Sequence, residues 1–475
     1  MSTGHNAVRI DAEAYRAGLR CLREFRVRVA AASEAPVGDN SSAEQRELHA
    51  LAVEFCRTAA ELSFGSAPYE HSPLSLVTEQ LCAEIPLALE YNEQCFDAIL
   101  VRAGTRAREI DLTELGFLMY AAEEAGVRLS RTWLLLLDSS YRRRGKLEPA
   151  RLFRLCDYTA AAQRMRDRAR LRVPDLLKAA RAERPAELPR CSRLGHCPVC
   201  DGPRHEMSRD DLRTLGGRRA SVREWYRAGY RRISELPDDL PFDRQQHVQR
   251  HAVVSGHPQI QREALQSFLE RLSFPLAFLD FEAFGSALPL YEDVGPFERV
   301  PFLFSSQILK TPDSEPQSVE YIMKPGPDDR EELCRALVAA LLPIETVVVY
   351  DATFERAVLA GLSGRFPQFA DSLRAINARI CDLLVPFRSL WYYHPEQRGR
   401  YSMKTILPLL CGFNWSDLTV QDGRQAAELY VQLCLRQSPL DKAEMQLAEL
   451  RRYCRRDTAG MVALYRALRA ASALQ

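Results

Sequence analysis

Residues 274–284 read "FPLAFLDFEAF". Nine of these eleven side chains are apolar, and the two exceptions are Asp280 and Glu282. A short apolar run predicts a buried strand, and residues two apart on a strand share one face. Unpaired carboxylates beside a core are costly. A divalent cation with oxygen ligands would neutralise this pair, whereas solvent or an arginine at the strand end would satisfy it without a metal.

Length and composition describe a globular chain with more than one domain. The chain has 475 residues, of which 46% are hydrophobic and 27% charged, which excludes a disordered protein. The formal net charge is only +1, so any contact with nucleic acid must come from local basic patches. Two basic segments, "YRRRGK" at 141–146 and "QRMRDRARLRV" at 163–173, fit a phosphate-facing surface or solvated helix faces.

The sequence gives no sign of membrane insertion. The N-terminal residues lack an apolar core of signal-peptide type, and no apolar run is long enough to cross a bilayer. We therefore expect a cytoplasmic protein with no membrane partner. In a reducing compartment, the 13 cysteines argue against a disulfide framework.

The texture of the sequence changes along the chain. The first part is mainly helical with a few strands, and it ends in the cysteine- and proline-rich stretch "LPRCSRLGHCPVCDGPRHE" at 188–206. From residue 274, apolar strands alternate with helical stretches, which indicates an α/β layered domain. We expect three parts: residues 1–206, a helical linker module at 207–272, and an α/β domain at 273–475.

Further acids occur on two later elements of the C-terminal part. The segment "VVVYDATFERAVL" (347–359) predicts a buried strand running into a helix, with Asp351 and Glu355 near the junction. In "YCRRDTAGMV", Tyr453 and Asp457 are four residues apart, and hence on one face of a helix. Met461, Leu464 and Leu468 continue this face. Three separated elements are thus predicted to send acids toward one centre.

This order of motifs resembles the DEDD superfamily of 3′→5′ exonucleases in its tyrosine-bearing form, whose fold is a ribonuclease-H-like sheet flanked by helices. With "ICDLLVPFRSLWYYHPEQRGRYSMKTILP", the same blocks resemble a bacterial family labelled domain of unknown function 2779. The resemblance implies that Asp280, Glu282 and Asp457 hold two Mg²⁺ or Mn²⁺ ions. It also implies that Tyr453 orients the attacking water.

The resemblance assigns roles to four further residues. Glu355 stands where the superfamily usually has an aspartate, and Asp351 where asparagine is common. Asp382, in "ICDLL", is the alternative fourth acid. Lys404, in "YSMKTILP", would contact the scissile phosphate, or it is an ordinary surface lysine.

Three cysteines near residue 200 predict a metal site. Cys191, Cys197 and Cys200 lie within ten residues, and tetrahedral coordination needs a fourth ligand. The candidates are His196, His205 and the distant Cys21. A histidine would give a zinc site. One early cysteine with three late ones resembles the iron–sulfur staple of RecB-like nucleases, which implies a [4Fe–4S] cluster.

RecB-like nucleases of the PD-(D/E)XK type carry an aspartate followed by E-x-K on the next strand. Asp97 in "FDAILV" fits the first position and Glu109 in "REIDL" fits the second, but Asp111 stands where the lysine belongs. That substitution reverses the charge that positions the water. We therefore expect a degenerate PD-(D/E)XK-like domain that binds DNA or plays a structural part without cutting.

Together these features predict a metal-dependent 3′→5′ exonuclease that hydrolyses DNA, or RNA, by a two-metal mechanism. Its partner would be a nucleic acid with a 3′ end. The alternative is a catalytically decayed protein that binds nucleic acid or serves as a scaffold. In that case its protein partners would belong to a repair or antiphage assembly.

Overall fold

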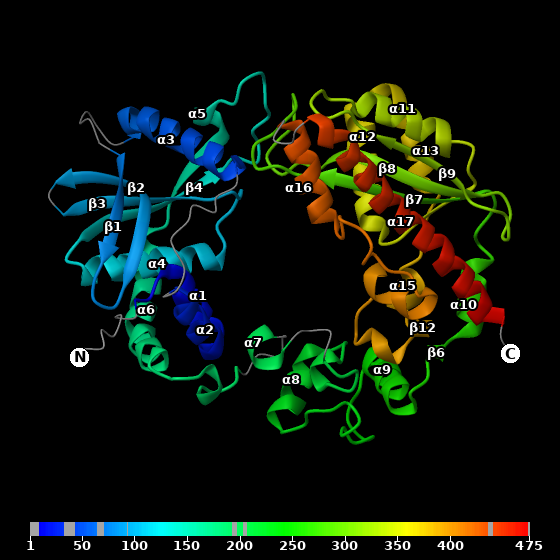
Figure 1. Ribbon diagram of the computed structural model, residues 1–475, viewed down its shortest axis with the longest axis horizontal. Helices are drawn as coiled ribbons and strands as arrows, with labels where there is room; N and C mark the ends of the chain where they lie inside the picture. Colours follow the sequence, from blue (N-terminus) through cyan, green and yellow to red (C-terminus); the bar gives the residue numbers. More distant parts are fainter. Residues whose placement is uncertain are drawn as a thin grey trace. The chain divides into compact units, whose positions relative to one another are not determined.

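The computed structural model describes residues 9–32, 43–63, 71–92, 94–191, 197–202, 207–435 and 440–473. Within these residues the protein is mixed α/β, with two five-stranded sheets and flanking helices (Figure 1). The chain forms two compact units. The first unit contains Met1–Glu206 and Ser286–Glu298, and the second contains Met207–Gly285 and Arg299–Gln475.

This division differs from the expected three parts in two places. Residues 207–272 group with the second unit instead of forming a separate module. One reason is that Ile260 pairs with Tyr392 in a small antiparallel sheet. Residues 286–298 group with the first unit, where the backbone N–H of Ala287 donates to Glu44 at 2.8 Å. The expected boundary after residue 206 coincides with a unit boundary.

The first unit is a sheet with helices on both faces. Its helices are α1 (Ala12–Arg20), α2 (Leu22–Ala32), α3 (Ala43–Ser63), α4 (Glu109–Glu124), α5 (Pro149–Leu152), α6 (Thr159–Ala180), η1 (Pro185–Glu187) and α7 (Pro198–Asp201). Its strands are β1 (His71–Val77), β2 (Cys82–Asn92), β3 (Cys95–Val101), β4 (Arg128–Leu137) and β5 (Phe153–Asp157). They lie in chain order, and only β3 and β4 pair in parallel.

Two cores follow from this layering. One core lies between the sheet and α1, α2, α4 and α6, and the other lies under α3 and α5 (Figure 1). The apolar runs "FDAILV" and "TWLLLLD" lie in β3 and β4, as predicted. Because alternate side chains of these strands face opposite cores, the apolar residues run consecutively in Ala98–Val101 of β3 and Trp133–Leu137 of β4.

The prediction that "REIDL" lies on a strand is wrong. Glu109 is the first residue of α4, and Arg108 is its N-cap. The Asp111 carboxylate accepts a hydrogen bond from the backbone N–H of Arg108 at 2.9 Å, which closes the first turn of the helix. An acid near the start of a helix also interacts favourably with the helix dipole. Asp111 is therefore part of a helix cap.

The second unit is built around a mixed sheet. Its helices are η3 (Leu212–Thr214), α8 (Arg219–Arg227), α9 (Arg244–Ser255), α10 (Arg262–Leu269), α11 (Arg330–Leu341), α12 (Ala352–Arg365), η4 (Pro367–Phe369), α13 (Ala370–Ala378), α14 (Val385–Arg388), η5 (Pro395–Gln397), α15 (Met403–Cys411), α16 (Gly423–Cys434) and α17 (Leu440–Ala473). Its strands are β6 (Gln259–Ile260), β7 (Leu276–Phe284), β8 (Val300–Leu309), β9 (Gln317–Ile322), β10 (Thr346–Val349), β11 (Ile380–Asp382) and β12 (Tyr392–Tyr393).

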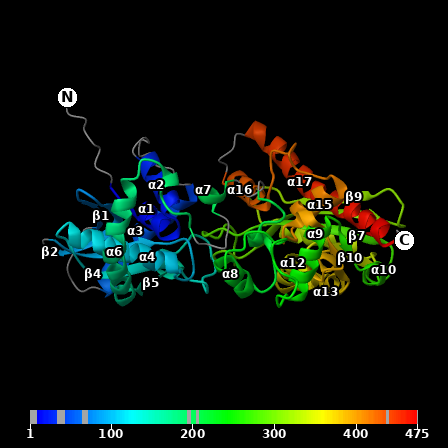
Figure 2. The same ribbon diagram turned by 90° about the horizontal axis from the view of Figure 1, so that it is seen from below.

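Strand β7 is the centre of the larger sheet, whose order is β11-β10-β7-β8-β9. It pairs in parallel with β10 and antiparallel with β8. Helices α16 and α17 lie on one side of the sheet, and α12 and α13 lie on the other (Figure 2). The apolar residues of "FPLAFLDFEAF" are thus covered on both faces. The Phe278 ring lies 5.7 Å from that of Tyr465 on α17.

In the described part of the chain, no helix combines the length and the apolar character that a membrane crossing needs.

Replacing Gly116 of α4 with alanine should destabilise the first unit. A Cβ atom there would lie 2.6 Å from the backbone carbon of Met165 and 2.7 Å from the nitrogen of Arg166, so α4 and α6 would have to separate. We expect a loss of about 1–3 kcal/mol in the free energy of unfolding, measured by calorimetry. As a control, Gly361→Ala in α12 meets open space and should leave stability unchanged or raise it. Equal losses in both variants would contradict this packing argument.

Candidate functional site

Strand β7 presents Asp280 and Glu282 on the face that α17 covers. Glu282 is 6% exposed, whereas Asp280 keeps partial exposure. The pairing between β7 and β8 shifts register directly after Glu282. Opposite Asp280 in β8 lies Ser305, whose hydroxyl is 3.1 Å from that of Thr458 on α17. This contact fixes the helix over the two acids.

Helix α17 brings further side chains to the same place. The Cys454 sulfur lies 3.3 Å from Oδ2 of Asp280. The buried Asp457 carboxylate accepts a hydrogen bond of 2.6 Å from the Trp415 indole, and its charge acts on both Asp280 and Glu282. The predicted convergence of strand and helix acids is therefore present. Among the described residues, these acids form no ion pair with an arginine.

Lys404 and Tyr453 lie beside these acids. The Lys404 ammonium is 3.4 Å from the Tyr453 hydroxyl and 5.3 Å from the centre of its ring. Its positive charge acts on Glu282 and Asp457. Helix α15, which carries Lys404, approaches α17 closely because Gly460 has no side chain there. Lys404 itself is exposed, and its ammonium also donates to the backbone carbonyl of Gln421.

Glu355 is a fourth acid at this place, and its negative charge acts on both Asp280 and Glu282. It is 3% exposed, and its Oε2 atom has no hydrogen-bond partner. We call Asp280, Glu282, Glu355 and Asp457 the acidic centre. A buried carboxylate oxygen without a partner is costly, so the acidic centre is incomplete without a further donor or cation.

Asp351 and Asp382 have other surroundings. Asp382 accepts hydrogen bonds from the backbone N–H groups of Asp351 at 2.9 Å and Leu384 at 2.8 Å. A third comes from Ala352 at 3.2 Å, so Asp382 holds the turn from β10 into α12. Asp351 is exposed, has a positive φ of 64°, and lies 3.9 Å from Arg388.

The start of α16 closes another side of the acidic centre. A Cβ atom at Gly423 would lie 3.3 Å from Oε2 of Glu282, so glycine leaves room beside this carboxylate. Asp422, the N-cap of α16, adds a further negative charge that acts on Glu282.

Burial and mutual repulsion perturb the acids strongly. Burial, followed by repulsion from Asp457 and Glu282, raises the pKa of Asp280 well above its usual value. Burial also raises the pKa of Glu355 to about 8 and that of Asp457 to about 6, against the hydrogen bond from Trp415. The pKa of Glu282 is raised well above its usual value by burial and Asp457. Part of the acidic centre is therefore protonated near neutral pH when no cation is bound.

The donor set fits hard divalent cations. The four acids supply carboxylate oxygens, which Mg²⁺ and Mn²⁺ prefer. The unpartnered oxygen of Glu355 and the space beside Gly423 give such a cation ligands and room. One ligand atom each from Asp280, Glu282 and Cys454 lies within 4.8 Å of the others. Among the described residues, that group of ligand atoms does not include Asp457 or Glu355.

Sequence reasoning missed Cys454, Trp415 and Gly423. Cys454 had a usable signal, because it precedes Asp457 by three residues and so shares its helix face. Trp415 and Gly423 had none, because only the folded chain brings their loops to the acidic centre.

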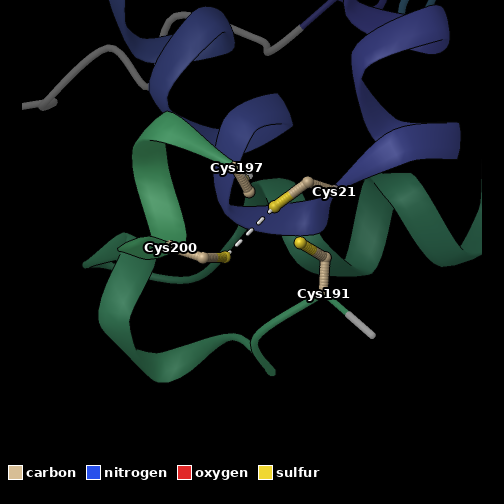
Figure 3. A group of neighbouring side chains, drawn as sticks. All are labelled: Cys21, Cys191, Cys197 and Cys200. Carbon is tan, nitrogen blue, oxygen red and sulfur yellow. Dashed lines mark hydrogen bonds between the residues drawn. The ribbon is translucent and has the colours of Figure 1, made fainter. Parts of the chain in front are cut away.

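The first unit contains a second candidate site, the cysteine cluster of Cys21, Cys191, Cys197 and Cys200. Figure 3 shows the four side chains pointing toward one another. Their sulfur atoms all lie within 4.8 Å of one another, and those of Cys21 and Cys200 are 3.5 Å apart. Four sulfur atoms at these distances could bind a metal. Of the candidate fourth ligands, Cys21 is therefore in place, whereas His196 and His205 lie outside the described residues.

Local contacts position these cysteines. Cys21 ends α1, and Arg23 at the start of α2 donates a hydrogen bond of 2.8 Å to the carbonyl of Leu188. The Asp201 carboxylate accepts from the backbone N–H of Cys197 at 2.8 Å. Burial raises the pKa of Cys21 to about 12. Burial opposes ionisation of Cys197 as well, but hydrogen bonds from Cys200 and its neighbours lower that pKa.

Asp97 and Glu109, the acids matched to the PD-(D/E)XK motif, lie in different surroundings. Asp97 is fully buried and accepts hydrogen bonds from the backbone of Arg131 at 2.9 Å and the Trp133 indole at 3.0 Å. Glu109 lies on a helix instead of the neighbouring strand. The two residues therefore lack the expected strand-to-strand arrangement.

Part of the chain matches a known sequence family. Residues 277–402 match the sequence model of a family described as "Domain of unknown function (DUF2779)". The matched segment includes Asp280, Glu282 and Glu355 but ends before Lys404 and Asp457. Neither the curated proteins nor the solved structures gave a match to the chain.

The metal-free protein should lose stability as pH rises. Glu355 and Asp457 have pKa values of about 8 and about 6 in the folded state, above those of unfolded chains. Their contribution is complete near pH ~4 and is lost as pH rises through the folded values. Melting temperatures from pH 5 to 9 with chelator should fall, and Mn²⁺ should reverse the fall. Glu355→Gln should flatten the melting-temperature curve in the upper part of this pH range. A wild-type melting temperature that does not change with pH would refute the raised pKa values of Glu355 and Asp457.

Cys197→Ser should remove metal from the cysteine cluster and destabilise the first unit, because binding free energy at such a site contributes directly to folding. Elemental analysis of purified protein should find iron or zinc in the wild type and a loss in the variant. Cys95→Ser, on β3 away from the cluster, is the control and should retain the metal. Equal metal content in both variants would exclude the cluster as the ligand set.

Proposed function

We propose that the protein is a metal-dependent nuclease whose second unit hydrolyses phosphodiester bonds of DNA or RNA from 3′ ends. The observation that carries this proposal is the convergence of Asp280 and Glu282 from β7 with Asp457 from α17. Glu355 of α12 adds a fourth acid. A mixed sheet flanked by helices, with D-x-E on its central strand, supports a DEDD-type exonuclease of ribonuclease-H-like fold. The match to the family described as DUF2779 agrees with this reading and names no activity.

In this proposal, the acidic centre holds two Mg²⁺ or Mn²⁺ ions. When bound, such a pair supplies a nucleophilic water and neutralises charge on the leaving oxygen. Asp280 keeps partial exposure, whereas the other three acids are buried. Trp415 fixes the orientation of Asp457, and the glycine at 423 keeps the carboxylate of Glu282 free to move toward its ligand position.

Tyr453 and Lys404 have complementary parts. Burial, with repulsion from Asp457, raises the pKa of Tyr453 far above neutrality. Tyr453 therefore stays protonated and orients the attacking water by hydrogen bonding, without removing its proton. Lys404, 3.4 Å from its hydroxyl, places a positive charge where the scissile phosphate would lie.

We assign the first unit a supporting part. Its cysteine cluster would hold a [4Fe–4S] cluster, for which four thiolates are suitable ligands, and zinc is the alternative for the same sulfur atoms. Asp97 and Asp111 have hydrogen-bonding roles in the first unit, so the proposed cleavage is assigned to the second unit. The first unit would then bind nucleic acid or stabilise the protein.

The proposal predicts cleavage of end-labelled strands that depends on Mg²⁺ or Mn²⁺ and proceeds from the 3′ end. Asp280→Asn should reduce the rate by about 10³-fold or more, because transition-state charge would no longer be neutralised. Tyr453→Phe should reduce the rate with little loss of metal binding. The panel should contain single- and double-stranded DNA and RNA, labelled at either end.

Asp371→Asn is the matched control, since Asp371 is highly exposed on α13 and should be replaceable without effect. If the Asp280→Asn variant cleaved strands at the wild-type rate with the same dependence on metal, catalysis would lie elsewhere in the protein. A protein that binds strands yet never shortens them with any divalent cation would instead be a binding protein or scaffold.

A further inference from the structure

Helix α8 of the second unit has a buried face and a strongly basic face. On the inner side, Val222 and Trp225 are buried, and the Trp225 ring meets Phe242 edge-on at 5.2 Å. The surrounding segment, residues 218–232, reads "RRASVREWYRAGYRR". Its exposed arginines, which we call the α8 basic face, are Arg218, Arg219, Arg223, Arg227, Arg231 and Arg232.

The positive charge of this face is largely uncompensated. Several acids lie nearby. Glu224 is on α8 itself, Glu235 accepts from the backbone N–H groups of Arg231 and Arg232 and interacts with their charges, and Asp243 accepts from the backbone N–H of Arg218. Asp210 accepts from Ser234, and Asp238 pairs with Arg250. Within the described part of the chain, four members of the face form no ion pair with a carboxylate: Arg218, Arg223, Arg227 and Arg232.

This arrangement costs the helix stability. Arg223 and Arg227 are one turn apart, and like charges at that spacing repel each other. Arg219 lies in the first turn, where a positive charge opposes the helix dipole. Its pKa is lowered by burial and then by the charge of Arg223. The stability of α8 does not account for these arginines, whereas an anionic partner would relieve the repulsion.

The chemistry of the face favours phosphates on a polymer. Guanidinium groups bind phosphate through paired hydrogen bonds, and side chains at i and i+4 lie about 5–6 Å apart, which gives a row of contacts. Arg231 also lies flat over Tyr226, 4.1 Å from its ring centre. Between residues 218 and 232, all described, no large apolar side chain is exposed. The face therefore lacks the apolar anchors of a membrane-binding helix.

The segment that carries α8 is joined to the acidic centre through packed contacts. Gln249 of α9 accepts from the backbone N–H of Gly216 at 2.9 Å. On the same helix, Gln245 donates a hydrogen bond of 2.6 Å to the Tyr401 hydroxyl. Tyr401 precedes Lys404 by three residues. The α8 basic face and the acidic centre are thus parts of one folded unit.

We propose that the α8 basic face binds the sugar-phosphate backbone of a nucleic acid strand, without reading its bases. The inference rests on the proposed function only for what happens to the bound strand afterwards. Binding itself is a separate property that does not need the acidic centre to be active.

Fluorescence anisotropy of the full chain tests the inference. The probes are a labelled single-stranded DNA oligonucleotide of mixed sequence and its RNA counterpart, without added divalent cation. For single strands, the logarithm of the binding constant falls with the logarithm of salt concentration by about 0.7 per phosphate contact. At 0.1 M salt, compared with 1 M, each contact therefore contributes about fivefold in affinity. Arg223→Gln with Arg227→Gln should therefore weaken binding about 10- to 30-fold on every sequence and reduce the salt slope by about 1.4.

The matched control is Arg335→Gln with Arg374→Gln. These arginines are exposed on α11 and α13 of the same unit and pair with neighbouring acids, so the change in net charge is equal. The control should bind like the wild type. The α8 variant should melt at the wild-type temperature or higher, because it loses a repulsive pair.

Equal affinities for the two double variants, or equal losses in both, would overturn the inference. Binding to phosphatidylserine vesicles that the α8 variant abolishes, with no binding to strands, would also overturn it. Failure of the nuclease proposal has a different signature, since strands would then bind through α8 and remain uncut. Cleavage with unchanged binding in the α8 variant would overturn this inference alone.

Discussion

The second unit is organised around the repulsion among carboxylates that its fold brings together. Asp280 and Glu282 lie on the central strand, and Asp457 and Glu355 come from helices on opposite sides of the sheet. Assembling these charges away from water opposes folding. The positive charge of Lys404 and the hydrogen bond from the Trp415 indole offset only part of this unfavourable free energy. Packing of α17 on the sheet, through Tyr465 and Thr458, supplies the rigidity that keeps the acids in place.

The two units offer ligands of opposite character. The first has four sulfur atoms, which are soft ligands for iron or zinc, and the second has carboxylate oxygens, which suit Mg²⁺ or Mn²⁺. Cys454, beside Asp280, is the exception within the acidic centre. The cysteine cluster also closes a long loop, since Cys21 and Cys200 are 179 positions apart.

Local sequence patterns predicted the elements well where one physical signal dominated. The apolar runs at 274–284 and 132–138 lie largely in strands β7 and β4. Met461, Leu464 and Leu468 form a buried stripe on the long helix α17. The prediction failed at Glu109, where a motif match alone favoured a strand. There, capping by Asp111 and the acidic first turn determined a helix. The grouping of residues 286–298 with the first unit depends on contacts with Glu44, far away in the chain.

The sequence by itself singled out the candidate residues that the fold then brings together: the acids at 280, 282 and 457, the tyrosine one turn before the last of them, and three of the clustered cysteines. Periodicity placed the acids on shared faces, because neighbours along a strand or helix have fixed relative directions, and the family resemblance gave them roles. Tertiary structure alone decided the contributions of Trp415 and Gly423. It also engaged Asp382 in a turn and completed the cysteine cluster with Cys21. These outcomes depend on which loops meet in space, and local spacing does not encode contacts between residues that are distant in the chain.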